Sequence, residues 1–309
     1  MHFDTLVILG ATAGGKTALA VAAARRFGGE IISADSRQVY RGMDLGTGKD
    51  LAEYGEVPCH LIDIVAAGTE YNLFRFQRDC YAALAAIRQR RRLPLICGGT
   101  GLYLDAVLRN YQLADVPIDP ALRQRLAGQS DEELRQLLLQ LRPQQHNRTD
   151  LADRDRLVRA CEIALGEQSG AIPAGSPPLV PLVFGLRWPR EVLRQRIAAR
   201  LAERLQAGMI EEVEQLHAAG IGWEQLEFYG LEYRMIAWHL QGRLSRNDME
   251  QKLRSAIGQF AKRQETFFRR MEKQGVAIHW LDGPADPFGT LCRIVAEHDL
   301  SGVRNGGPL

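Results

Sequence analysis

Short apolar runs alternate with helical stretches through the first third of the chain. The runs at residues 6–9, 30–33 and 93–97 have the length and apolar content of buried strands. An alanine-rich stretch at residues 17–27 follows the first run and has the composition of a helix. Strands that alternate with helices are typical of a parallel sheet with helices on its faces. The pattern therefore predicts an α/β fold.

Residues 117–178 interrupt this alternation and lack the periodicity of a sheet. Three stretches have helical patterns: residues 120–126, 131–141 and 153–165. Ser130 and Asp131 are candidate caps for the second of them. Residues 170–178 are rich in Gly, Pro and Ala and predict a linker, after which an apolar run at 179–186 predicts a returning strand. This order indicates a small all-helical insertion within the sheet domain.

We accordingly predict three segments in the chain of 309 residues, which has the length of about two folded units. The first part of the core covers residues 1–116, the helical insertion 117–178, and the second part of the core, with basic C-terminal helices, 179–309. Within this last segment, residues 190–216 carry Leu and Ile at i,i+4 steps. That spacing predicts a long amphipathic helix packed on the sheet.

The composition is that of an ordinary globular protein. Apolar residues make up 46% of the chain and charged residues 25%, and the net charge of +2 is compatible with local basic patches. No apolar run approaches the ~18 residues of a membrane span, and the first residues lack the basic flank of an export signal. The five cysteines are widely spaced without a C-x-x-C pair, which argues against a disulfide scaffold or a thiolate zinc site: Cys59, Cys80, Cys97, Cys161 and Cys292. We therefore expect a cytoplasmic protein that does not span a membrane.

A glycine-rich segment joins the first predicted strand to the first predicted helix and matches G-x-x-x-x-G-K-[ST]. In such a loop, consecutive backbone N–H groups surround phosphate oxygens, the helix adds its positive end, and the lysine adds a full charge. The threonine hydroxyl is a ligand for Mg²⁺. The candidate diphosphate-binding residues are Gly10, Ala11, Thr12, Ala13, Gly14, Gly15, Lys16 and Thr17. The alternative is a glycine-rich turn that only packs the strand against the helix.

Polar and glycine residues follow the other predicted strands. Asp35 comes after the strand at 30–33 and should lie near the phosphate loop, because ligands bind at the carboxyl ends of parallel strands. A carboxylate there can hold water on a metal or accept a proton, although capping of a helix is an alternative. Residues 98–100, Gly-Gly-Thr, stand where a motor NTPase has an acidic residue, and they predict a close backbone approach to a ligand. Asp63 is a further strand-end carboxylate that fits a structural role equally well.

Two segments have the charge of an RNA-binding surface. Arg156 and Arg159 share one face of a predicted helix, where they could contact successive phosphates or pair with nearby acidic residues. Residues 250–273 contain seven Lys or Arg and three acidic residues, interleaved with phenylalanines. A basic helix with aromatic rings suits RNA, and an ordinary solvated helix face is the alternative.

Further motifs accompany the phosphate loop along nearly the whole chain. They lie at residues 35–44, 46–49, 58–63, 98–103, 261–264 and 267–269. Together with the loop they resemble the tRNA dimethylallyltransferase (tRNA isopentenyltransferase) family, from about residue 5 to residue 282. The chain departs from the family pattern at Ala11 and Gly14, at residues 146–150 and at residues 257–260. The changes in the loop should matter little, because backbone amides bind the phosphates.

The resemblance implies a P-loop NTPase-like parallel sheet flanked by helices, with a small all-helical insertion domain. It implies transfer of a dimethylallyl group from dimethylallyl diphosphate to N6 of adenine 37, next to the tRNA anticodon, giving N6-(dimethylallyl)adenosine and diphosphate. Lys16 and Thr17, with Mg²⁺ as cofactor, would stabilise the leaving diphosphate. Asp35 would accept the proton of the amine, and Thr100 would contact the RNA where the two substrates meet.

The same resemblance implies the partners. The tRNA-binding residues would be Asp35, Ser36, Arg37, Gln38, Thr100, Arg123, Asp155, Arg156, Arg159, Lys262, Arg263, Gln264 and Arg269. We expect the insertion to bind the stem of the tRNA anticodon stem–loop and the basic C-terminal segment to support its loop. The adenine would leave its stack before it reaches the donor. The chain is expected to act as a monomer.

Three other functions remain open at this level. An adenylate (AMP) isopentenyltransferase would keep the chemistry with a smaller acceptor, which needs neither the helical insertion nor the basic C-terminal helix. A P-loop kinase of small metabolites would turn over ATP. A non-catalytic, nucleotide-dependent RNA-binding protein would bind tRNA without forming a product.

Overall fold

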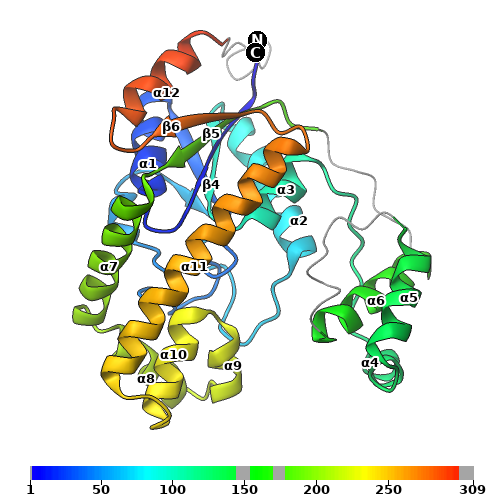
Figure 1. Cartoon of the computed structure of the whole chain (residues 1–309). Helices are drawn as coiled ribbons and strands as arrows, with labels where there is room; N and C mark the ends of the chain where they lie inside the picture. Colours follow the sequence, from blue (N-terminus) through cyan, green and yellow to red (C-terminus); the bar gives the residue numbers. More distant parts are fainter. Residues whose placement is uncertain (1, 144–153, 170–177, 299–309) are drawn as a thin grey trace. The chain divides into compact units, whose positions relative to one another are not determined.

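The computed structural model describes residues 2–143, 154–169 and 178–298, and the chain divides into two compact units (Figure 1). The first unit comprises Met1–Asn110 and Pro178–Leu309, and the second comprises Tyr111–Pro177. The second unit thus begins a few residues before the boundary at 117 that the sequence suggested. Helix α3 of the first unit ends at Leu108, and the connecting segment belongs to the second unit from Tyr111 onward.

One sheet of six parallel strands forms the centre of the first unit, counted over the described residues. Its strands are β1 (Thr5–Gly10), β2 (Gly29–Ser33), β3 (Cys59–His60), β4 (Leu93–Gly98), β5 (Pro181–Arg187) and β6 (Ile278–Asp282). Their order across the sheet is β3-β2-β4-β1-β5-β6. In register, Leu6 of β1 lies beside Leu95 on one side and Leu182 on the other. The predicted parallel α/β fold is confirmed.

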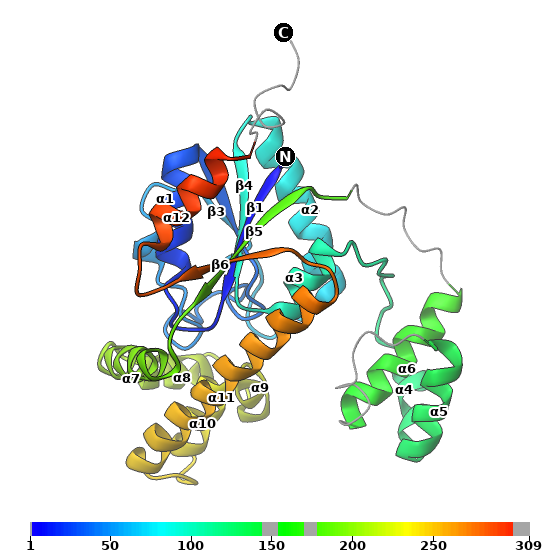
Figure 2. The same cartoon turned by 45° about the horizontal axis from the view of Figure 1, so that its top comes forward.

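Helices cover both faces of the sheet because residues of each strand alternate between the faces. Leu6 and Ile8 pack in one core cluster with α1 and α12, and Val7 and Leu9 pack in another with α2 and α3 (Figure 2). These helices are α1 (Lys16–Phe27), α2 (Leu73–Gln89), α3 (Gly101–Leu108) and α12 (Pro287–Ala296). Strand β1 is therefore buried between two apolar layers, and the phosphate loop begins at its carboxyl end.

A third core cluster forms around a group of helices after β5. Its helices are α7 (Arg190–Gln206), α8 (Met209–Ala218), α9 (Trp223–Phe228), α10 (Leu231–Leu240) and α11 (Arg246–Lys273), and a short 3-10 helix, η1 (Leu51–Glu53), lies in the loop after β2. Ser245 caps α11 by accepting the backbone N–H of Asp248 at 3.1 Å. Ile257 and Ala261 of α11 belong to this third cluster, whereas Phe268 belongs to the cluster on the sheet. One long helix therefore connects both cores.

The second unit is helical in its described part, as predicted, with α4 (Pro120–Ala127), α5 (Asp131–Leu141) and α6 (Arg154–Ser169). Ser130 caps α5 in a capping box with Glu133, which confirms one of the two predicted caps. Leu134, Leu138 and Leu157 form a separate apolar core, so the unit has its own packing. The departures from the family pattern at residues 146–150, and all but the last residue of the linker predicted at 170–178, lie outside the described residues.

Among the described residues, no helix is both long and apolar enough to cross a lipid bilayer.

Candidate active site

The phosphate loop has the backbone geometry of an anion site. Ala13 and Gly15 adopt left-handed conformations with φ of 58° and 85°, and such alternation directs successive N–H groups to one side. α1 begins at Lys16 without a side chain that caps its first turn. Its first N–H groups are therefore available to an anion, and the helix dipole adds a partial positive charge.

Lys16 folds back onto this loop, where its Nζ donates to the carbonyl of Ala11 at 2.9 Å. Burial lowers the pKa of Lys16; Cys97 and Asp35 counteract this shift, and the charge of Arg200 adds to it. Lys16 follows β1 and Asp35 follows β2, so both lie at the carboxyl ends of the strands on either side of β4. A bound diphosphate would add negative charge next to this half-buried lysine.

Asp35 begins the loop after β2 and is half-buried. Its Oδ1 accepts the backbone N–H of Arg37 at 2.9 Å, in a turn that does not begin a helix, so the capping alternative is wrong. The neighbouring N–H of Ser36 donates to Oγ1 of Thr100 at 3.0 Å. Thr100 therefore fixes the backbone beside Asp35 and places β2 and β4 in one polar junction.

The two glycines before Thr100 approach protein atoms. A Cβ on Gly98 would lie 2.2 Å from the carbonyl oxygen of Ala34, and a Cβ on Gly99 would lie 2.5 Å from Nε2 of Gln264. The sequence suggested a close approach to a ligand at these glycines. In the structure the approach is made by the β2 backbone and by α11, because neighbouring segments pack there without room for a side chain.

Gln264 connects α11 to the phosphate loop. Its Oε1 accepts the N–H of Thr12 at 2.8 Å, and its Nε2 donates to the carbonyl of Gly99 at 2.8 Å. The residue is only 7% exposed, so both ends of its amide are engaged within the protein. Gln264 was expected to contact tRNA, and the structure gives it a positioning role between two loops of the site.

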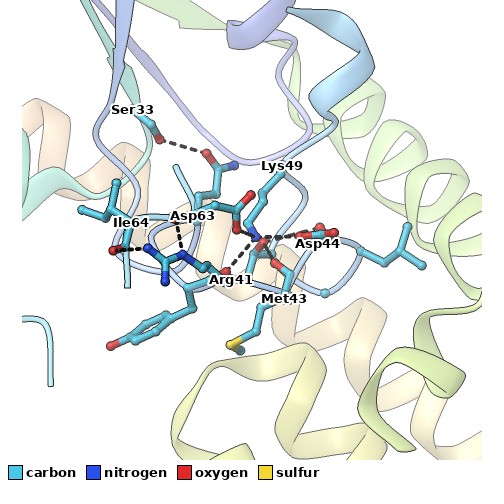
Figure 3. A network of polar contacts seen from close by, with 12 residues as sticks. Ser33, Arg41, Met43, Asp44, Lys49, Asp63 and Ile64 are labelled. Atoms are coloured by element: carbon cyan, nitrogen blue, oxygen red, sulfur yellow. Dashed lines mark hydrogen bonds and ion pairs between the residues drawn. The ribbon is translucent and has the colours of Figure 1, made fainter. Parts of the chain in front are cut away.

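Hydrogen bonds of Gln38 and Lys49 stabilise the loop after β2, and Figure 3 shows Lys49 between Asp44 and Asp63. Gln38 accepts from the hydroxyl of Ser33 at 2.9 Å and donates to the carbonyl of Gly48 at 3.0 Å, so the amide that was expected to contact tRNA has protein partners at both ends. Lys49 is 1% exposed and donates to the Tyr40 carbonyl at 2.7 Å, to Asp44 at 2.6 Å and to Asp63. Asp63 thus has the structural role that the sequence left open.

Helix α7 and the residue before it contribute contacts that sequence reasoning missed. Trp188 donates from its indole to the carbonyl of Gly14 at 2.8 Å, and Arg196 donates from Nε to the carbonyl of Ala13 at 2.8 Å. The Arg196 guanidinium lies 4.4 Å from the centroid of the Trp188 ring. Arg200, one turn further along, forms an ion pair with Asp50. The only sequence signal was arginine at i,i+4 spacing on a helix interpreted as packing.

The remaining predicted tRNA-binding residues differ in exposure. Arg123 and Arg159 form ion pairs with the buried Glu162 at 2.9 and 2.8 Å. Burial opposes the ionisation of Glu162, but hydrogen bonds from Arg159, from the Asp119 N–H and from Arg123 lower its pKa. The rest of the set is exposed: Asp155 and Arg156 on α6, and Lys262, Arg263 and Arg269 on α11. The paired arginines of the insertion thus stabilise their own unit.

Residues 38–271 match the IPP transferase family, and residues 3–56 match the Isopentenyl transferase family. The "tRNA dimethylallyltransferase 2" of Syntrophotalea carbinolica is 61% identical over 295 residues, which cover 95% of this chain and 99% of that protein. The chain belongs to the tRNA dimethylallyltransferase family.

Other members of this family are similar over nearly their whole length. The "tRNA dimethylallyltransferase 1" of Geotalea uraniireducens is 60% identical over 93% of this chain and 95% of that protein. The crystal structure of the full-length tRNA isopentenylpyrophosphate transferase from Bacillus halodurans superimposes with a TM-score of 0.71 at 31% identity, covering 95% of this chain and 96% of that one. The arrangement of phosphate loop, Asp35 and Thr100 is thus found in a chain with the fold of the family.

Proposed function

We propose that this member of the tRNA dimethylallyltransferase family transfers a dimethylallyl group from dimethylallyl diphosphate to N6 of adenine 37 next to the tRNA anticodon. The products are N6-(dimethylallyl)adenosine and diphosphate. The observation that carries the proposal is the placement of Lys16, in the phosphate loop after β1, and of Asp35, after β2, at the carboxyl ends of the two parallel strands that flank β4. The positive charge of Lys16 can stabilise an anionic leaving group, and the carboxylate of Asp35 can accept a proton.

The phosphate loop binds the diphosphate end of the donor in this proposal. Its free first-turn N–H groups and Lys16 stabilise the charge that accumulates as the carbon–oxygen bond of the donor breaks. Arg196 donates to the loop carbonyl of Ala13, and Arg200, which is paired with Asp50, lies near enough to Lys16 to lower its pKa. These cations around the loop favour a diphosphate over an uncharged ligand.

The Thr17 hydroxyl is a suitable ligand for a magnesium ion that arrives with the diphosphate of the donor. Mg²⁺ usually keeps several waters and binds through one or two protein oxygens together with phosphate oxygens. Thr17 follows Lys16 in the first turn of α1, and no group of three or more His, Cys, Asp or Glu side chains forms a metal site within the described residues. We expect the Thr17 hydroxyl to hold the ion beside the diphosphate, whose charge the bound ion would reduce.

Asp35 accepts the proton that leaves N6 as the new carbon–nitrogen bond forms. The N–H of Arg37 occupies Oδ1, which leaves the second carboxylate oxygen for the substrate. Thr100 and Ser36 support this position through the hydrogen bond between them. Asp35 thus takes the proton, N6 of the adenine takes the dimethylallyl carbon, and the phosphate loop holds the diphosphate that leaves.

The acceptor in this proposal is the anticodon stem–loop of tRNA, bound by a monomer in the cytoplasm. Lys262, Arg263 and Arg269 are exposed on α11, the helix whose Gln264 contacts the phosphate loop. Basic side chains in this position suit phosphate groups of an RNA. The absence of disulfides among the five cysteines fits a reducing compartment.

One experiment separates this function from the alternatives. The protein is incubated with labelled dimethylallyl diphosphate and tRNA, with the same donor and AMP, and with ATP alone. The proposal expects labelled tRNA, no labelled AMP and no ATP turnover. Label on AMP alone would indicate an adenylate isopentenyltransferase, ATP turnover a kinase, and tRNA binding without label a non-catalytic RNA-binding protein.

A further inference from the structure

Phe228 is an unusual side chain for its place in the fold. It ends α9 and is 66% exposed, the largest exposure among the large apolar side chains of the described residues that face solvent. Single exposed apolar residues are common on protein surfaces and need no function. Phe228 differs because a charged residue of the candidate active site lies against its ring.

That residue is Arg37. Its guanidinium lies 5.2 Å from the centroid of the Phe228 ring, within the range of a cation–π interaction. The backbone N–H of the same Arg37 donates to Asp35 at 2.9 Å. One residue therefore touches the exposed ring with its side chain and the proposed proton acceptor with its backbone.

The neighbours of Phe228 keep its ring in solvent. Leu226 is fully buried and Tyr229 is 3% exposed, so both sides of the helix end are anchored in the core. The hydroxyl of Tyr229 accepts the N–H of Gly68, and its ring lies 4.8 Å from that of Tyr40. Because these contacts fix the backbone, Phe228 cannot turn inward.

The chain then leaves α9 through a constrained turn. Gly230 has a φ of 139°, a conformation that residues with a side chain rarely adopt, and an added Cβ would lie 4.0 Å from Nε of Arg37. The turn thus holds the end of α9 close to Arg37. The exposed ring is presented at a fixed place beside the candidate active site.

We propose that Phe228 and Arg37 form a stacking platform for an unpaired nucleobase of the RNA acceptor, adjacent to the target adenine. This inference rests on the proposed function. When an adenine leaves a stacked loop, the neighbouring base loses one stacking partner. An exposed aromatic ring replaces that partner with little dependence on the base, and an adjacent arginine adds attraction for the base and its phosphate.

The acidic residue next to the platform, Glu227, does not oppose the binding of RNA. Glu227 forms an ion pair with Arg243 at 3.0 Å, and its backbone carbonyl accepts Nε of Arg234. Its charge is therefore compensated by Arg243, which follows α10. An RNA with its negative backbone suits Arg37 at this place better than an apolar peptide, which would leave the guanidinium without a polar partner.

The test uses the full-length protein and an anticodon stem–loop RNA that carries 2-aminopurine beside the target adenine. Fluorescence of 2-aminopurine falls when the base stacks on an aromatic ring. Phe228→Ala should remove this quenching and weaken RNA binding by about 5- to 150-fold, since a base–aromatic stack is worth about 1–3 kcal/mol. Phe228→Tyr should restore both, because it keeps the ring.

Two further measurements isolate the platform. Donor affinity, measured without RNA, should stay close to that of the unmodified protein in Phe228→Ala. The control is Val180→Ala, an exposed apolar residue at the amino-terminal edge of the sheet, which should leave RNA affinity and quenching unchanged.

Unchanged quenching and affinity in Phe228→Ala would overturn the proposal, as would a loss of affinity that Phe228→Tyr fails to restore. A change of oligomeric state in Phe228→Ala with unchanged RNA affinity would assign the ring to a contact between copies of the chain and would also overturn it. If the unmodified protein transferred no label to tRNA, the proposed function would fail by itself, and quenching that depends on Phe228 would still support the platform.

Discussion

Gln264 accepts the backbone N–H of Thr12 at 2.8 Å, although 252 positions separate these residues in the chain. The same amide donates to the carbonyl of Gly99. Helix α11, the phosphate loop and the segment before Thr100 are therefore joined by one buried side chain. The residues before Gln264, Lys262 and Arg263, are exposed and basic. Helix α11 therefore presents basic side chains that suit RNA to solvent, while its buried Gln264 contacts the phosphate loop.

Replacing Gln264 by Leu should destabilise the protein. The substitution leaves the buried carbonyl of Gly99 and the part-buried N–H of Thr12 without these partners, and a buried group that loses its partner costs about 1–3 kcal/mol. Urea denaturation of Gln264→Leu measures this loss. Thr266→Ala, an exposed position two residues further on α11, should change the free energy of unfolding by less than about 0.5 kcal/mol. Equal stability of the two variants would contradict the role assigned to Gln264.

Lys49→Met should also destabilise the protein. It leaves Asp44 and Asp63 without their cation, but these carboxylates are 51% and 34% exposed, so water compensates for part of the loss and we expect a cost of about 1–3 kcal/mol. The free energy of unfolding measures the loss. Arg25→Gln removes an exposed ion pair with Glu56 and should cost less than about 1 kcal/mol. A small effect at Lys49 would show that the loop after β2 does not depend on this network.

The lowered pKa of Glu30 predicts that the folded protein loses stability in acid. Hydrogen bonds from Arg90, and then from His60, lower its pKa from 4.5 to about 2 despite burial. Because the folded protein holds the charged form more tightly than the unfolded chain, this stabilisation is present above pH 4.5 and is lost as the pH falls toward 2. In acid titrations of stability, Glu30→Gln should lack this part of the decline. An identical pH profile for both proteins would refute it.

Lys16→Ala should weaken binding of dimethylallyl diphosphate. A charge-assisted contact to the diphosphate disappears, which corresponds to about 1.5–3 kcal/mol of binding free energy. Calorimetric titration of the donor, without RNA, measures the change. Arg263→Ala alters an exposed residue of α11 and should leave donor affinity as it is. Unchanged affinity in Lys16→Ala would place the diphosphate elsewhere.

The elements that could be predicted from sequence are those that local patterns specify. The apolar runs identified β1, β2, β4 and β5, and the G-x-x-x-x-G-K-[ST] spacing located the phosphate loop, because strand, turn and helix follow one another directly there. The helical insertion was recognisable for the same reason. Its helices have their own caps and their own apolar core.

The parts that could not be predicted depend on contacts between distant segments. Gln264 and Gln38 have the residue type of RNA contacts, yet their amides are used by backbone groups that only the fold brings near. Trp188 reaches the phosphate loop from the segment after β5, and Arg196 reaches it from α7, whose periodicity indicated packing alone. Gly98 and Gly99 marked a close approach correctly, but the sequence did not show that protein atoms make it.

In the proposed reaction Asp35 accepts the proton of the adenine amine while Lys16 and its loop hold the donor. Asp35→Asn is the decisive variant, because the amide oxygen can still accept the N–H of Arg37 while the base and its negative charge are lost. Single-turnover transfer from labelled donor to tRNA should slow by about 10²–10⁴-fold, with unchanged calorimetric affinity for the donor. Transfer at the rate of the unmodified protein would contradict the account.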